Sequence, residues 1–331
     1  MRAVTMVGDG TIAVREHPDP QPQAGEVLVR VAGAGLNRAD LMQRAGFYPA
    51  PPGSPPDILG MEFAGTVVAM GEGVEHPAIG TEVFGIVGGG AQAELLVVPV
   101  GQCAAVPSGL DLVAMGGVPE AFVTAHDAMC TQAAVVADDW VLVHAVGSGV
   151  GTTALQLAKA FGARVVGTSR SAAKLDRCAT LGLDHGIVPP TNAEGALDVA
   201  ALASEITTVT GGGANVVLDL VAGAYVEADV LGCAPGGRIV LIGTLAGGSA
   251  TLPILSVMQK RLRMFGTVLR PRSVAEKTAA TDAFVRDVVP FLAAGTIAPV
   301  VEATLPLSDA TEAYDLLASD ATFGKIILHT A

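Results

Sequence analysis

Short apolar runs separated by glycine and proline make up the first third of the chain. Val, Ile and Leu recur in brief stretches that break at turn residues before the next begins, over 1–7, 11–17, 26–36, 63–71, 81–87 and 93–100. Such runs predict short antiparallel strands that form a barrel or a sandwich. Residues 46–60 hold five prolines, so this segment is expected to be a stiff irregular loop.

From about residue 120 the pattern changes to apolar strands that alternate with amphipathic helices. A buried-strand run over 140–146 precedes a stretch with Ala154, Leu157, Ala158 and Phe161 at helical spacing. Alternation of this kind predicts a parallel sheet covered by helices. The strand runs that continue it lie at 163–169, 186–190, 215–221 and 238–244.

The C-terminal part of the chain returns to the character of the first part. A helical stretch is expected from about Val274 to Ala294, and the segments 299–307, 309–319 and 324–330 follow it, the last as a strand. The β-rich ending favours a chain that comes back to complete the first domain.

Length, charge and cysteine content narrow the class of protein. A chain of 331 residues favours two domains. The net charge is −13 and no basic cluster is present, which argues against nucleic-acid binding. No apolar run reaches the roughly 18 residues of a membrane helix, and no secretion signal is apparent, so a cytoplasmic location is the expectation. The four cysteines lie far apart and are expected to be buried thiols.

A glycine-rich turn carries the clearest chemical signal. Gly147, Gly149 and Gly151 follow the strand over 140–146 and open the helical stretch. Backbone N–H groups and the helix dipole at such a turn favour an anion, and a dinucleotide's diphosphate is the natural ligand. The strict G-x-G-x-x-G spacing is absent, because Thr152 stands where its last glycine would fall when counted from Gly147.

The residues after the next strand indicate which nucleotide is bound. NAD sites place an acid about 20 residues after the turn. This chain has no acid there before Asp176. Hydroxyls and two cations there would suit the 2′-phosphate of NADPH. The alternative is a solvated helix start with exposed basic residues. The residues concerned are Thr168, Ser169, Arg170, Ser171 and Lys174.

Five segments, taken in order, resemble the zinc-free quinone oxidoreductases of the medium-chain dehydrogenase/reductase superfamily. They are "GLNRADLMQRAGFYPAPPG", "ILGMEFAGTVVAMG", "VPEAFVTAHDAM", "HAVGSGVGT" and "FGKIIL". The pattern is most similar to the tumour-suppressor-inducible quinone oxidoreductase subgroup. The resemblance covers essentially the whole chain.

The resemblance implies an α/β fold, with a GroES-like β-barrel catalytic domain and a Rossmann domain built on a doubly wound parallel sheet. The first part of the catalytic domain would span 1–117, the Rossmann domain 118–263, and the segment 264–331 would complete the catalytic domain. NADPH would bind in the cleft between the domains and pass hydride to a quinone, and the protein would be a homodimer.

The resemblance also assigns residues. Asn37 and Tyr48 would line the nicotinamide and the substrate. The family motif A-x-x-G-x-x-G falls on Ala145, Ser148 and Gly151. A tyrosine that often covers the adenosine phosphate in the family is replaced here by prolines in "GIVPPTN". The other residues that the resemblance implies along the cofactor are Thr124, Gly243, Thr244, Lys325, Phe265 and Gly266, the last two also near the dimer contact. The turn and the strand after it already predict contacts with the cofactor at Gly147, Gly149, Val150, Ser169, Arg170, Ser171 and Lys174.

Three of these residues have structural alternatives. Asn37 could cap the helix that begins at Arg38. Tyr48 could simply pack within the proline-rich loop, and Lys325 could extend a partly buried stem to solvent beside a strand.

Two positions argue against a catalytic zinc. The zinc-dependent relatives have a cysteine where this chain has Asn37, and a histidine where it has Met61, directly before Glu62. An amide and a thioether are poor zinc ligands, so no metal site is predicted and Glu62 is expected to be a paired structural carboxylate. Quinone reduction is the predicted activity. Reduction of α,β-unsaturated carbonyls, a non-enzymatic NADPH sensor and an alcohol dehydrogenase remain alternatives.

Overall fold

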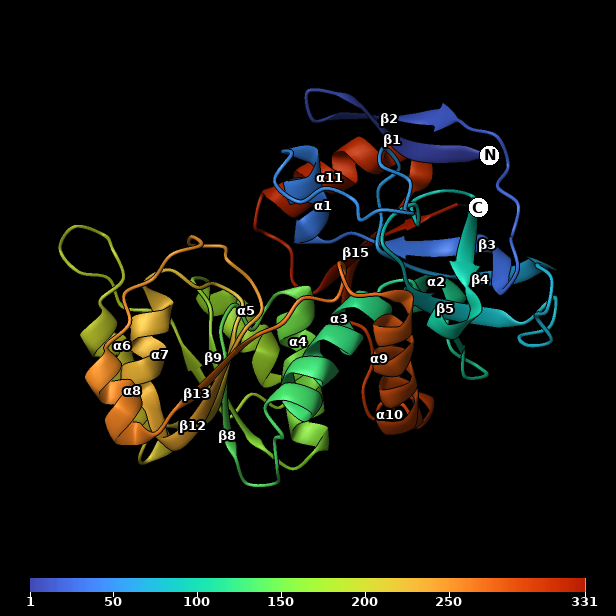
Figure 1. Ribbon diagram of the computed structural model, residues 1–331. Coiled ribbons are helices and arrows are strands. Elements are labelled where there is room, and N and C mark those ends of the chain that lie inside the picture. Colours follow the sequence, from blue (N-terminus) through green and yellow to red (C-terminus); the bar gives the residue numbers. More distant parts are fainter. Residues whose placement is uncertain (331) are drawn as a thin grey trace. The chain divides into compact units, whose positions relative to one another are not determined.

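The computed structural model describes residues 1–330 and divides the chain into two compact units, each considered by itself (Figure 1). Unit 1 comprises Met1–Val123 and the segment from Leu269 onward, and unit 2 comprises Thr124–Val268. The boundaries expected from the sequence, 117 and 263, fall a few residues before these. Within residues 1–330, no helix is both long and apolar enough to cross a membrane.

Unit 1 is built on a seven-stranded sheet to which both ends of the chain contribute. Its order is β14-β15-β3-β4-β5-β7, and β6 also pairs with β3. β15 pairs antiparallel with β3, which confirms that the C-terminus returns to the first domain. The strands are β3 (Glu26–Gly35), β4 (Glu62–Met70), β5 (Glu82–Ile86), β6 (Leu95–Pro99), β7 (Cys103–Ala105), β14 (Val301–Pro306) and β15 (Lys325–His329).

A hairpin and several helices complete the described part of unit 1. The helical stretch expected over 274–294 is divided in two at Val288, because Pro290 has no N–H to continue the first helix. The elements are β1 (Arg2–Gly8), β2 (Thr11–Glu16), α1 (Arg38–Arg44), α2 (Leu112–Met115), α3 (Pro119–His126), α9 (Val274–Asp287), α10 (Val289–Ala293) and α11 (Ala310–Ala318), with 3₁₀ turns at Val100–Gln102 and Leu307–Asp309. The last three residues of α3 belong to unit 2.

Unit 2 is a six-stranded, fully parallel sheet with helices between successive strands. Its order is β10-β9-β8-β11-β12-β13, which in chain order reads 3-2-1-4-5-6 and is the doubly wound Rossmann arrangement. The predicted fold class is therefore confirmed. The strands are β8 (Trp140–Val143), β9 (Arg164–Thr168), β10 (His185–Ile187), β11 (Ala214–Asp219), β12 (Cys233–Leu241) and β13 (Arg263–Gly266).

The apolar periodicity of unit 2 explains its packing. β8 is buried along its whole length because it lies at the centre of the sheet. Ala154, Leu157 and Ala158 form the buried stripe of α4, as their spacing predicts, while Phe161 ends the helix half-buried. The helices are α4 (Gly149–Ala160), α5 (Ala172–Ala179), α6 (Val199–Thr210), α7 (Tyr225–Gly232) and α8 (Ile254–Lys260), and a π-helical turn covers Asp127–Gln132.

The cysteines follow the expectation only in part. Cys178 and Cys233 are buried, but Cys103 and Cys130 are half-buried, and within residues 1–330 none of them forms a disulfide. The prediction of four buried thiols was therefore wrong for two of them. Burial still raises the pKa of the Cys103 thiol to about 12, so this cysteine is a poor nucleophile at neutral pH.

Candidate active site

A buried ammonium lies at the centre of unit 1. Lys325 is the first residue of β15 and its side chain is 5% exposed. Its Nζ donates to Glu62 Oε1 at 2.5 Å, to Asn37 Oδ1 at 2.7 Å and to the carbonyl oxygen of Leu36 at 2.9 Å. These three bonds use all three ammonium hydrogens. Lys325 therefore points into the protein and does not extend to solvent, contrary to the structural alternative.

Glu62 is the matching anion, and every bond it needs is made inside unit 1. It begins β4 and is fully buried. Oε1 accepts from Lys325 and, at 2.8 Å, from Asn37 Nδ2, and Oε2 accepts from the backbone N–H of Glu120 at 2.8 Å. A buried ion pair is stable only when its other hydrogen bonds are satisfied. Glu62 is thus a paired carboxylate, as expected.

Space for this pair depends on a glycine next to it. Gly35 ends β3, and a Cβ at this position would collide with Glu62 Oε1. Met61, at the position where zinc relatives have histidine, is buried, with its side chain 1% exposed.

Asn37 caps a helix, as the structural alternative predicted, and also joins the buried ion pair. It is the N-cap residue of α1, where Asp40 Oδ2 accepts from its backbone N–H at 2.8 Å. Its side chain bridges Lys325 and Glu62. Because both ends of the amide are held, one N–H of Nδ2 keeps a fixed direction and remains available to another acceptor.

Two more carboxyls near this network have raised pKa values. Burial raises the pKa of Asp40 to about 6, and its Oδ1 is a buried oxygen without a hydrogen-bond partner among residues 1–330. Burial, reinforced by the negative charge of Glu62, raises the pKa of Glu120 to about 7. Carboxyls with such pKa values are typical of functional sites.

Arg270 holds the proline-rich loop that carries Tyr48. The side chain of Arg270 is buried, its Nε donates to the carbonyl oxygen of Gly88 at 2.7 Å, and its Nη1 donates to that of Tyr48 at 3.0 Å. Nη2 donates to Gln43 Oε1 at 2.5 Å. The guanidinium lies 5.2 Å from the centre of the Tyr48 ring, a cation–π contact. Tyr48 therefore packs in its loop, and its half-buried phenol makes no hydrogen bond with any residue that the structure describes.

The glycine turn of unit 2 has the geometry expected of an anion site. α4 begins at Gly149, and the hydroxyl of Ser148 caps it by accepting from the N–H of Gly151 at 3.1 Å. The N–H groups of Gly149 and Val150, in the first turn, need an acceptor from outside the helix. Ser148, at the middle-glycine position of the family motif, thus contributes a cap that glycine would lack. These donors fit a diphosphate.

Close packing at this turn requires two further residues of the motif. Ala145 adopts φ +50, in the left-handed region that non-glycine residues seldom occupy. A Cβ on Gly151 would lie 2.7 Å from the carbonyl carbon of Val146. The first turn of α4 therefore fits against the end of β8 only with glycine at 151. Gly147 is buried between these positions.

The residues predicted to select NADPH gather just after β9. Ser169 follows the strand, its Oγ accepts from the N–H of Ser171 at 3.2 Å, and Ser171 caps α5. Arg170 lies between the two serines and is exposed, and Lys174 is half-buried in the first turn of α5. Thr168 is buried at the end of β9.

The remaining predicted cofactor residues lie on α3, on β13 and after β12. Gly243 follows β12, where a Cβ would approach the carbonyl oxygen of Leu220 to 2.5 Å, and Thr244 is exposed beside it. Phe265 and Gly266 end β13, half-buried and exposed respectively. Thr124 is buried on α3.

The structure brings some of these residues together and adds others. Asn37 and Lys325, assigned to different roles, share one network with Glu62. Glu120 and Arg270 were not predicted. No local pattern identifies them, because their importance comes from partners far along the chain.

A second missed cluster lies in the core of unit 2. His144 contacts Thr168 Oγ1 at 2.8 Å through Nδ1 and Asp229 Oδ1 at 2.7 Å through Nε2. Burial alone would lower the pKa of His144, but the charge of Asp229 raises it. Burial raises the pKa of Asp229 to about 7.

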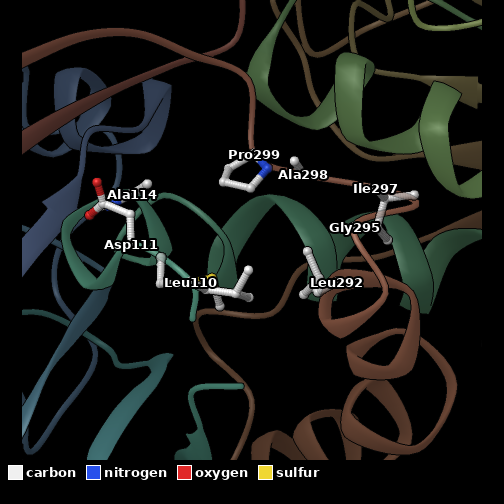
Figure 2. Close-up of a pocket in the computed structure, with 9 residues that line it drawn as sticks. Leu110, Asp111, Ala114, Leu292, Gly295, Ile297, Ala298 and Pro299 are labelled. Carbon is white, nitrogen blue, oxygen red and sulfur yellow. The ribbon is translucent and has the colours of Figure 1, made fainter. Parts of the chain in front are cut away.

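An apolar pocket of about 230 Å³ in unit 1 is separate from these residues. Figure 2 shows Asp111 and Ala114 on one side and the segment from Leu292 to Pro299 on the other. None of the predicted site residues lines it. The lining residues are Leu110, Asp111, Ala114, Met115, Leu292, Gly295, Ile297, Ala298 and Pro299.

Both units match known families of domains. Residues 23–108 match the GroES-like domain of alcohol dehydrogenases, and residues 149–284 match the family described as zinc-binding dehydrogenase. The match in unit 2 begins at the first residue of α4.

Similar proteins span a range of activities. Polyketide synthase GfsB of Streptomyces halstedii is 36% identical over 221 residues, which are 67% of this chain but 4% of the synthase. The chain thus spans only a small part of that relative. The crystal structure of an NAD-dependent alcohol dehydrogenase is 32% identical with a TM-score of 0.84, and each chain is covered completely. A mycobacterial protein complexed with NADPH is 26% identical with a TM-score of 0.86, again over both whole chains.

Proposed function

Because the chain belongs to the medium-chain dehydrogenase/reductase superfamily, we propose that it is an NADPH-dependent reductase that transfers hydride to a quinone without a metal. Its membership makes it an oxidoreductase with a GroES-like domain and a Rossmann domain. The observation that carries the finer proposal is the network of Lys325, Asn37 and Glu62. In this network the ammonium of Lys325, and not a metal ion, is the proposed positive charge beside the buried carboxylate of Glu62.

The donor set supports chemistry without zinc. Asn37, Met61 and Glu62 offer an amide, a thioether and a carboxylate that already accepts three hydrogen bonds. Zinc prefers thiolate, imidazole or a free carboxylate in tetrahedral reach. Among residues 1–330, no three His, Cys, Asp or Glu side chains are grouped so that they could hold a metal ion.

The residues of unit 2 support NADPH as the cofactor. The N–H groups of Gly149 and Val150 would bind the diphosphate, and Arg170 with Lys174 would bind the 2′-phosphate. NADPH supplies a hydride when bound, and the protein's part is to bind, orient and stabilise charge. The two solved relatives differ in the cofactor that their descriptions name, so the preference has to be measured.

Tyr48 and Asn37 are the groups proposed to contact the acceptor. An oxyanion develops on a quinone as hydride arrives, and hydrogen-bond donors lower the energy of that charge. The phenol of Tyr48 makes no hydrogen bond within residues 1–330, and Asn37 has one unused amide N–H in a fixed direction. Arg270 keeps the Tyr48 loop in place.

Two alternatives share this cofactor site. Reduction of an α,β-unsaturated carbonyl uses the same hydride but needs a proton at carbon, and the raised pKa of Glu120, about 7, favours it as a second activity. A non-enzymatic NADPH sensor would bind the cofactor tightly and turn over no acceptor.

A homodimer is proposed through the edge of unit 2. β13 is the edge strand of its sheet, and the neighbouring α8 exposes Ile254, Leu255 and Met258 by 64, 66 and 68%. Exposed apolar side chains beside an open strand edge favour association with another copy.

The central test compares acceptors and cofactors on one preparation. We expect NADPH oxidation with 1,4-benzoquinone, a slower rate with NADH, no bound zinc by elemental analysis, and the sedimented mass of a dimer.

Tyr48→Phe should lower kcat/KM for the quinone about tenfold, because one hydrogen bond to a developing charge is lost. The KM for NADPH should stay within about twofold, because the phenol is assigned to the acceptor alone.

Each part of this proposal has its own contradicting result. Stoichiometric zinc would contradict a metal-free reaction, and a monomeric mass would contradict the dimer. If Tyr48→Phe impaired the kinetic parameters for quinone and for NADPH equally, the proposal that Tyr48 contacts the acceptor would be wrong. Tight NADPH binding with no turnover on quinones or enones would favour the sensor.

Arg170 and Lys174 are expected to set the cofactor preference. The double variant Arg170→Ala with Lys174→Ala should lower kcat/KM for NADPH by about 10- to 100-fold and leave that for NADH nearly unchanged, because one charge-assisted hydrogen bond contributes about 1.5–3 kcal/mol. Steady-state kinetics with both cofactors measures the ratio. Arg177→Ala, further along the same helix, is the control, and an unchanged ratio in the double variant would show that these cations are only a solvated helix start.

A further inference from the structure

The carboxyl of Glu120 is bonded differently from that of its neighbour Glu62, although a hydrogen bond connects the two residues. The backbone N–H of Glu120, in the first turn of α3, donates to Glu62 Oε2 at 2.8 Å. Both carboxylate oxygens of Glu62 accept hydrogen bonds, whereas the half-buried carboxyl of Glu120 makes no hydrogen bond or ion pair with any residue from 1 to 330. One carboxylate is thus committed to the protein, and the other is available to a ligand.

Charged groups from several elements surround the Glu120 carboxyl. Burial and the charges of Glu62 and Asp40 favour its neutral form, while Lys325 and Arg270 favour its charged form. The balance leaves its pKa at about 7. Glu62 is held by hydrogen bonds on both of its oxygens, so of the two adjacent carboxyls only Glu120 is available to give a proton to a ligand. The facing groups are Glu62 on β4, Lys325 on β15, Asp40 on α1, Lys277 on α9, Tyr48 in the proline-rich loop and Arg270.

Glu120 lies on α3 near one residue predicted to contact the cofactor and near another proposed to contact the acceptor. Thr124, predicted to lie along the cofactor, is four residues further on and therefore on the same face of the helix. On the acceptor side, Glu120 is close enough to Tyr48 for its charge to raise the pKa of the phenol, in addition to burial. The carboxyl of Asp40 cannot reach a bound acceptor in the same way, because its side chain is completely buried.

We propose that Glu120 is the general acid of the reduction, the group that gives the acceptor its proton. This inference rests on the proposed function. NADPH supplies two electrons and one hydrogen as hydride. With a quinone, the hydroquinone monoanion takes the proton as the O–H bond of Glu120 breaks and a new O–H bond forms. With an enone, hydride adds at the β-carbon and the enolate takes the proton at the α-carbon. Water then returns a proton to the carboxylate.

The pH dependence of the rate follows from the protonated form of Glu120, which is the form that must react. A general acid works only when protonated, so activity that depends on Glu120 should be full below its pKa of about 7 and fall as the pH rises above it. The enone reaction should show this decline more strongly, because carbon takes a proton from water more slowly than oxygen does. Asp40→Asn should keep this decline but move it to lower pH, because the negative charge of Asp40 favours the neutral form of Glu120.

The test compares Glu120→Gln with the wild type between about pH 5.5 and 9, using 1,4-benzoquinone and 2-cyclohexenone. Glutamine keeps the backbone bond to Glu62 and the side-chain shape but has no acidic proton. We expect kcat with the enone at about pH 6 to fall about 100-fold, within the range for general acids, and to lose its pH dependence. The Kd for NADPH should change less than about threefold. Glu312→Gln, at an exposed first-turn position of α11, is the matched control and should behave as wild type.

Glu120→Asp keeps a proton on a shorter side chain and should restore part of the rate together with a pH-dependent decline. If Glu120→Gln does not fold, the test rests on two other measurements. These are the loss of wild-type activity as the pH rises and the shift in the pH of that loss in Glu120→Asp. An active wild type whose rate and pH profile survive in Glu120→Gln would overturn the role of Glu120 and leave the proposed function intact. A wild type that binds NADPH but reduces neither acceptor would overturn the proposed function, and the general acid with it.

Discussion

Lys325→Met is expected to lower the free energy of unfolding by about 3–5 kcal/mol, because it leaves Glu62 as an unpaired charge in a buried position. The ammonium of Lys325 satisfies three acceptors at once, and methionine can replace its volume but none of its hydrogen bonds. Denaturant unfolding followed by circular dichroism measures the change.

The matched control for this prediction is Lys159→Met. Lys159 also pairs with a carboxylate, Asp184, at 2.8 Å, but both side chains are about one-third exposed. Such pairs contribute about 0–1 kcal/mol. Adding Glu62→Gln to Lys325→Met should recover part of the lost stability, because the buried charge is then removed. A loss no greater than that of Lys159→Met would show that water reaches Glu62.

Gly151→Ala is expected to raise the Kd for NADPH at least about tenfold. The added Cβ would meet the backbone of Ala145 and Val146, and neither can yield as a flexible side chain would. The first turn of α4 would have to move away from β8, which would displace the N–H groups proposed to bind the diphosphate. Overpacking should also cost about 1–3 kcal/mol of stability. Titration of NADPH fluorescence measures the affinity.

Gly248→Ala is the control, since Gly248 lies in unit 2, a Cβ there would have no atom within 4 Å, and its φ is not positive. Its NADPH affinity should match that of the wild type. An unchanged Kd in Gly151→Ala would mean that the cofactor's diphosphate does not depend on the start of α4.

Much of the fold could be predicted because the signals are local. The buried run at β8 and the helical spacing of Ala154, Leu157 and Ala158 identify a strand and the helix after it without any knowledge of the partners. The glycine turn between them is also local, so the sequence located it correctly. The division of the helix at Val288 was missed although Pro290 signals it.

The candidate site could be predicted only where residues match a family motif. Asn37 and Lys325 were predicted in this way as residues of separate roles, which stay predictions, and their shared contact with Glu62 was not foreseen. Glu120 was missed because a glutamate in the first turn of a helix is ordinary. Arg270 was missed because its partners Tyr48 and Gly88 lie far away in the sequence, with separations of 222 and 182 positions.

The sequence by itself determined the strands, the helices and the glycine turn, since each depends on spacing within one segment. The tertiary structure alone decided that an ammonium from the last strand neutralises Glu62, a separation of 263 positions, and that the Glu120 carboxyl beside it has no partner among residues 1–330. The physical reason is burial. The charge of a side chain in a protein interior depends on which groups the folded chain brings within a few ångströms, and no local pattern contains that information.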